Sequence, residues 1–155
     1  MLVSGEMKNR LELWRRLMAR SEEDLNSTQV RLTKVRNEGK KLAAQKDKLN
    51  RMKYEYAESL FSSCDQKDAG RRQFITRNFI THLDKTLSSI DDQIILTEAN
   101  GLRLKQLYDK QYRKFKKFES LHERGIKKND KDVRRQEEKI RDAQNVLDFS
   151  RKVGR

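Results

Sequence analysis

The sequence predicts an all-α fold: a long antiparallel two-helix coiled-coil hairpin with a C-terminal helical overhang. The 155 residues include no proline and only six glycines, which leaves few positions where a helix must stop. Charged residues make up 39% of the chain and hydrophobic residues 34%, a composition typical of coiled coils rather than of compact domains. Apolar residues also recur in steps of three and four along two segments. We therefore expect a single hairpin domain over residues 1–155.

The first helix is expected over about residues 5–60, because an apolar heptad stripe runs along this segment. Ten of its fifteen positions are apolar, so the stripe can pack against a partner helix, but its four Ser, Thr and Lys members make it looser than a leucine zipper. The stripe consists of Leu11, Trp14, Met18, Ser21, Leu25, Thr28, Leu32, Val35, Gly39, Leu42, Lys46, Leu49, Lys53, Tyr56 and Leu60.

A turn is expected over about residues 62–72, which show no apolar periodicity and contain Ser, Asp and Gly residues that cap and break helices. A connection this short forces the second helix to fold back antiparallel to the first. The turn also holds Cys64, which as the single cysteine excludes an internal disulfide and is interpreted as a passive thiol.

The second helix is expected over about residues 73–150 and carries a matching stripe. Its positions are Thr76, Ile80, Leu83, Leu87, Ile90, Ile94, Thr97, Gly101, Leu104, Tyr108, Gln111, Phe115, Phe118 and His122. Pairing the two stripes across the turn places Gly39 near Thr97 and Val35 near Gly101. Small residues at one level either let the helices approach closely or bend, or mark a local weakness without a role.

The same pairing places Gly5 opposite about Lys131, so residues 132–155 should project as an unpaired helix. We predict a break near Gly125 and the polar residues 127–132, where this overhang begins. An apolar stripe without an intramolecular partner is either a docking surface or part of a frayed tail. The candidate docking residues in the overhang are Arg134, Arg135, Ile140, Ala143 and Leu147.

The formal net charge of +13 is compatible with a nucleic-acid, membrane-surface or acidic-protein partner. Basic and acidic residues alternate along nearly the whole chain, which favours solvated helix faces over a dedicated nucleic-acid surface. No segment approaches 18 consecutive apolar residues, and residues 1–6 lack the pattern of a secretion signal. The sequence therefore predicts a cytoplasmic protein without a nucleic-acid partner.

No enzymatic chemistry is expected. The glycines form no nucleotide-binding loop, and His82 and His122 are forty residues apart along one helix, too far to share a metal ion. Asp91 and Asp92 are adjacent on a helix and point in different directions, as expected of a solvated pair rather than a metal site. We expect no catalytic residue, no cofactor and no metal.

Two motifs near the turn resemble those of a known family, the flagellar type III export protein FliJ and its injectisome relatives of the SctO (YscO-type) group. The family motifs read Gln-x3-Leu-x2-Tyr-x3-Tyr and Phe-x3-Leu-x2-Ala-x3-His, and five of the eight positions here are identical. The departures are Met52, Thr86 and Ile90. The corresponding residues are Gln45, Leu49, Met52, Tyr56, Phe79, Leu83, Thr86 and Ile90.

The resemblance covers nearly the whole chain and implies a function. Proteins of this family are stalks whose hairpin is similar to that of the rotary ATPase gamma subunit. The resemblance implies that the joined N- and C-terminal end binds the hexameric export ATPase, and that the eight motif residues bind the FlhA-like export gate protein. It also implies escort of export chaperones, a monomer in isolation, and a peripheral position at the inner-membrane export apparatus, reached through partners only. Near-complete collinearity favours the flagellum over the injectisome.

The seam divides the eight motif residues into two groups. Leu49, Tyr56, Leu83 and Ile90 fall on the predicted stripes and are equally well explained as core. Off the stripes lie Gln45, Met52, Phe79 and Thr86, together with the aromatic residues Tyr54, Phe61 and Phe74. The family also spaces aromatic and aliphatic residues at the positions of Tyr108, Phe115, Phe118 and Leu121.

Two alternatives remain: a basic coiled coil that binds nucleic acid or an anionic membrane, and a dimerisation scaffold whose heptads pair between chains. Binding to phosphates would fall steeply with salt, whereas gate binding would depend on particular side chains. Sedimentation would distinguish the scaffold from an internal hairpin.

Overall fold

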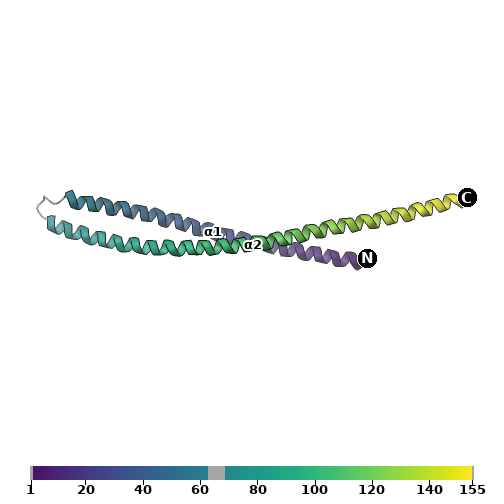
Figure 1. The fold of residues 1–155 in the computed structure, drawn as a ribbon, viewed down its shortest axis with the longest axis horizontal. Coiled ribbons are helices and arrows are strands. Elements are labelled where there is room, and N and C mark those ends of the chain that lie inside the picture. The colour runs from purple at the N-terminus through teal and green to yellow at the C-terminus, as the bar shows by residue number, and fades with distance from the viewer. Residues whose placement is uncertain (1, 63–68, 155) are drawn as a thin grey trace. The chain divides into compact units, whose positions relative to one another are not determined.

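A computed structural model describes residues 2–62 and 69–154, and places them in two α-helices, α1 (Leu2–Ser62) and α2 (Ala69–Val153) (Figure 1). The helices pack against each other as a hairpin, which confirms the predicted all-α fold. The second helix starts at Ala69 rather than near 73, so the flanks of the expected turn are helical. Its centre, with Cys64, lies outside the described residues.

The contacts of the chain separate into two units. The hairpin unit is Ser27–Tyr108, and the terminal unit combines Met1–Asn26 with Asp109–Arg155. Both helices contribute to both units, because the division falls within each helix.

The predicted stripes are confirmed as the buried seam within each unit. All fourteen stripe positions of α2 and fourteen of the fifteen on α1 are buried or half-buried, and only Tyr56 is exposed. The most enclosed apolar side chains of the hairpin unit are those of Leu32, Leu83, Leu87 and Ile90. Seam burial therefore holds the helices together by the hydrophobic effect, although a two-helix seam shields each side chain less than a globular core does.

Two ion pairs fix the register in the hairpin unit. The ammonium group of Lys46 lies 2.7 Å from a carboxylate oxygen of Asp91, and that of Lys53 contacts the carboxylate of Asp84. The lysines are seven residues apart on α1 and the aspartates seven residues apart, in the reverse order, on α2. Such reciprocal pairing is possible only between antiparallel helices in this register.

The small residues pair as predicted, but space does not require glycine at either position. A Cβ atom on Gly39 would lie 3.8 Å from Thr97 Cγ2, and one on Gly101 would lie 3.6 Å from Val35 Cγ1. Both are ordinary van der Waals distances. This finding favours local weakness over close approach of the helices as the meaning of these glycines.

In the terminal unit, Gly125 packs closely against α1. A Cβ atom there would lie 2.7 Å from Leu11 Cδ2, and the rings of Trp14 and Phe118 also pack together, with centroids 6.2 Å apart. The helix continues through Gly125 and residues 127–132, so the predicted break was wrong. A single glycine costs about 1 kcal/mol in a helix, and neighbouring polar residues cost less, which is too little to end so long a helix.

Beyond Asp132 the second helix is exposed on all sides. Every described side chain from 133 to 154 is exposed, while the helix continues to Val153, which confirms the predicted overhang. The amide of Gly154 donates a 3.0 Å hydrogen bond to the carbonyl oxygen of Ser150, and Arg151 and Lys152 occupy the last turn, where cations favour the helix dipole. Over the described residues, neither helix has an apolar stretch suited to spanning a bilayer.

Candidate partner-binding surfaces

All eight motif residues lie in the hairpin unit, but they differ widely in accessibility. Leu83 and Ile90 are buried, with 4% and 7% of their surface exposed, and Leu49 is half-buried. Gln45 is exposed, as predicted for a residue off the seam. Leu83 and Ile90 of α2 therefore pack in the seam, as expected if these motif positions are core residues.

The two motifs meet at an aromatic pair. The rings of Tyr56 and Phe79 have centroids 4.7 Å apart and are inclined by 60°, a geometry favourable for aromatic side chains. Tyr56 was predicted on the seam but is 39% exposed, whereas Phe79 was predicted off the seam but is half-buried. The contact explains both differences, because Phe79 leans onto the seam and Tyr56 lies at its edge.

Two further motif residues, Met52 and Thr86, are half-buried. The Thr86 hydroxyl donates a hydrogen bond to the His82 carbonyl oxygen within α2. This bond satisfies the hydroxyl within its own helix. Met52 adds an adaptable apolar side chain of the kind common at protein-binding surfaces.

The ion pair of Lys46 with Asp91 crosses the seam within the hairpin unit. Its hydrogen bond and the carboxylate charge raise the pKa of Lys46 above the ordinary value of 10.5. A raised pKa means that the pair stabilises the fold below the ordinary pKa, and that this contribution disappears as the pH rises through the raised value. Asp91 is thus engaged across the seam, whereas the sequence analysis predicted a solvated pair of Asp91 with Asp92.

Large apolar side chains are exposed where the two helices approach residues 63–68. Tyr54, Phe61 and Phe74 are exposed as predicted, with Phe61 at 87%. Ile75 is exposed as well and was missed by the sequence analysis. Its place directly before the seam residue Thr76 was the available signal, because neighbours on a helix point about 100° apart.

The additional family positions Tyr108, Phe115, Phe118 and Leu121 are half-buried. Phe118 packs on Trp14 within the terminal unit, so its aromatic character is explained by the seam.

The overhang presents an unbroken exposed helix. Ile140 and Leu147 are each 58% exposed, and with Ala143 they lie three and four residues apart, on one face. Arg134 and Arg135 are exposed one to two turns earlier. The five predicted docking residues are therefore all accessible.

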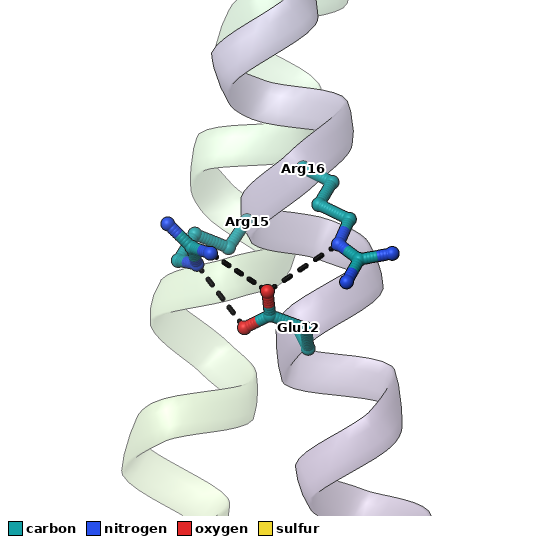
Figure 2. A network of polar contacts seen from close by, with 3 residues as sticks. All are labelled: Glu12, Arg15 and Arg16. Atoms are coloured by element: carbon teal, nitrogen blue, oxygen red, sulfur yellow. Dashed lines mark hydrogen bonds and ion pairs between the residues drawn. The ribbon is translucent and has the colours of Figure 1, made fainter.

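A compact charge network lies on α1 in the terminal unit (Figure 2). The Glu12 carboxylate accepts hydrogen bonds from Arg15, the shortest being 2.7 Å, and from Arg16 at 3.3 Å. The bond from Arg15 holds the pKa of Glu12 below its ordinary value of 4.5. The stabilisation of the fold by this bond is present at neutral pH and disappears as the pH falls through the lowered pKa of Glu12. These are interactions within one helix, and they organise its polar face.

No metal-binding cluster is found among residues 2–62 and 69–154. His82 is exposed in the hairpin unit and His122 is half-buried in the terminal unit. The accessible features are apolar and charged surfaces of helices, as in proteins that act by binding other proteins.

Comparison with known families shows which family the chain belongs to. A family model described as "Flagellar FliJ protein" matches residues 7–154. This chain belongs to the FliJ family. A search of curated proteins and a search of solved structures each gave no match. As a FliJ-family member, the chain is a flagellar export-related stalk protein of a non-catalytic family.

Proposed function

We propose that this FliJ-family protein is the non-enzymatic coupling subunit that links the export ATPase ring to the FlhA-like export gate in flagellar assembly. It would act on the cytoplasmic side of the export apparatus, peripheral to the membrane, and escort export chaperones. Its gate-binding surface lies in the hairpin unit and its ATPase-docking surface on the overhang. No bond is made or broken by this chain in that role.

The aromatic contact between Tyr56 and Phe79 is the observation that carries the gate assignment. It joins one residue of each family motif into a partly exposed patch, with the half-buried Met52 one helical turn before Tyr56 on α1. Partly exposed aromatic and methionine side chains lose the most water on binding and dominate many protein interfaces. Leu83 and Ile90 are assigned a supporting role, since they hold the two motifs together from within the seam.

The alternatives find less support. The heptad seam is filled within the chain, so a dimerisation scaffold would have no free seam to pair. A phosphate-binding coil would need a surface dominated by cations, whereas exposed apolar side chains, those of Phe61, Phe74 and Ile75, flank residues 63–68.

The test is a pull-down with the cytoplasmic domain of the cognate gate protein and with the export ATPase, comparing wild type with a Met52→Ala, Phe79→Ala variant. We expect gate affinity to fall by about tenfold or more, because truncating interface anchors typically costs this much. ATPase binding should be unchanged. Circular dichroism would verify folding, since Phe79 also packs on Tyr56.

An Ile95→Ala, Leu102→Ala variant is the matched control, because both side chains are exposed in the same unit but lie outside the eight motif positions. It should bind the gate like wild type. Undiminished gate binding by the Met52, Phe79 variant would overturn the assignment, as would salt-sensitive binding of DNA or acidic vesicles in place of both proteins.

A further inference from the structure

A groove runs between α1 and α2 along one flank of the hairpin unit, away from the aromatic pair. It consists of two adjoining hollows of about 480 and 410 Å³, and Glu38 lines both of them. Its α1 wall extends from Arg31 to Gln45 and its α2 wall from Gln93 to Leu104. The hollows follow successive helical turns, so together they form one continuous surface.

The groove has an apolar floor. Val35, Leu42 and Leu104 contribute their half-buried seam side chains to it, and Leu96 lines it while 66% exposed. Leu96 lies outside the predicted seam, so packing between the two helices does not account for a large apolar residue there. A single exposed leucine is common on protein surfaces, but Leu96 adjoins a concave apolar strip, and contiguous apolar surface of this kind marks interaction sites.

Four cations surround this floor: Arg31, Lys34, Lys41 and Arg103. Against them the lining carries one carboxylate, that of Glu38, which lies between the two lysines in sequence. Lys34 and Lys41 are seven residues apart, which is about 10 Å along a helix. The groove thus has positive charge at two levels, with a negative charge between them.

We propose that this groove docks an acidic amphipathic helix of a partner protein. Apolar residues of that helix would cover Leu96 and the floor, and carboxylates about two turns apart would pair with the cations at the two levels. The residue between them, opposite Glu38, would be neutral or basic. This is helix-in-groove recognition with electrostatic selection of the partner.

Other occupants fit less well. A second copy of this chain has a net charge of +13 and would bring cations against cations. Nucleic acid would match the cations but would leave the apolar floor unused, and its phosphates would meet the Glu38 carboxylate. A membrane surface cannot enter a concave strip between two helices.

The proposal goes beyond gate and ATPase binding and is tested separately from them. Of the eight motif residues only Gln45 lines the groove, and the test leaves it unchanged. The probe is a fluorescein-labelled helical peptide of about 20 residues, long enough to hold a helix, with leucines on one face and glutamates on its flanks. Its affinity for the full chain is measured by fluorescence anisotropy.

We expect wild type to bind this peptide and to discriminate against a version with lysine in place of each glutamate. A Lys34→Glu, Lys41→Glu variant and a Leu96→Ser variant should each weaken binding by about tenfold or more. The matched control is an Arg36→Glu, Lys105→Glu variant, which makes the same change in net charge at exposed cations outside the groove lining. It should stay within about twofold of wild type at physiological salt.

Equal losses in the groove and control variants would overturn the proposal, because they would indicate attraction by net charge alone. Equal binding of the lysine peptide would overturn it as well. Single-stranded DNA, acidic vesicles and sedimentation of the protein alone are measured in parallel. If wild type does not bind the peptide and the groove variants lose one of these other interactions, the proposal is overturned and the groove is assigned to that other occupant.

Discussion

Two lysines in the seam show how individual residues specify this hairpin. Lys46 and Lys53 occupy stripe positions where a leucine zipper would carry apolar residues, yet each faces an aspartate of the opposite helix. Apolar seams tolerate sliding by one heptad, whereas a charged residue in the seam favours the register in which it finds its partner. The pairs therefore contribute more to register than to stability, as expected of ion pairs near the surface.

A charge exchange tests this role. We expect Lys46→Glu and Asp91→Lys each to lower the thermal unfolding midpoint by a few degrees, since each places like charges together at the 2.7 Å contact. The double variant should recover most of the loss, because it restores an ion pair with the opposite polarity. A double-mutant cycle followed by circular dichroism measures the coupling, which should shrink at high salt.

Lys48→Glu combined with Asp91→Lys provides the comparison, because Lys48 is exposed and points away from the seam, two positions along α1. It should show no coupling. A coupling equal to that of Lys46 would mean that general electrostatics, not the cross-seam contact, sets the effect.

The glycines illustrate what decides the behaviour of whole helices. Gly39 and Gly101 have room for a methyl group, whereas one on Gly125 would press on Leu11. A helix-interior glycine costs about 1 kcal/mol relative to alanine, so three such positions weaken otherwise strong helices. Only the one at Gly125 is explained by packing.

Alanine substitutions separate the two cases. Gly39→Ala and Gly101→Ala should each raise the free energy of unfolding by about 0.5–1 kcal/mol, as helix propensity predicts when space permits. Gly125→Ala should gain less, because Leu11 must rotate to relieve the 2.7 Å approach. Urea denaturation monitored by circular dichroism measures all three. Equal gains at Gly101 and Gly125 would show that the contact with Leu11 is unimportant.

For the molecule as a whole, the proposed gate-binding and ATPase-docking surfaces lie in different units. The eight motif residues belong to the hairpin unit, while the exposed overhang belongs to the terminal unit. The seam residues of the hairpin unit lie between Ser27 and Tyr108, so none of them belongs to the overhang. Changes to the overhang should therefore leave the fold of the hairpin unit intact.

The overhang prediction uses this separation. An Ile140→Ser, Leu147→Ser variant should lose ATPase binding by about tenfold or more and retain gate binding, since both side chains are exposed and free to meet a partner. Glu138→Ser with Asn145→Ser, at exposed polar positions on another side of the same turns, is the control and should bind both proteins. Normal ATPase binding by the Ile140, Leu147 variant would remove the apolar stripe from the docking surface.

The sequence by itself determined the two helices, the seam positions, the pairing of Gly39 with Thr97 and of Val35 with Gly101, and the overhang. These features follow from helical periodicity and from the lack of proline, which act locally or through one alignment of the stripes. The membership suggested by the motifs was confirmed for FliJ by the family model over residues 7–154.

Only the tertiary structure decided which residues near the seam are accessible. The ring of Phe79 rests on Tyr56, Asp91 engages Lys46, Gly125 admits Leu11, and the groove beside Leu96 opens between the helices. Each feature depends on how far one helix is rotated about its axis relative to the other and on the rotamers that fill the space. Periodicity fixes which stripe faces the partner helix, but it does not fix the side-chain contacts at the edge of that stripe.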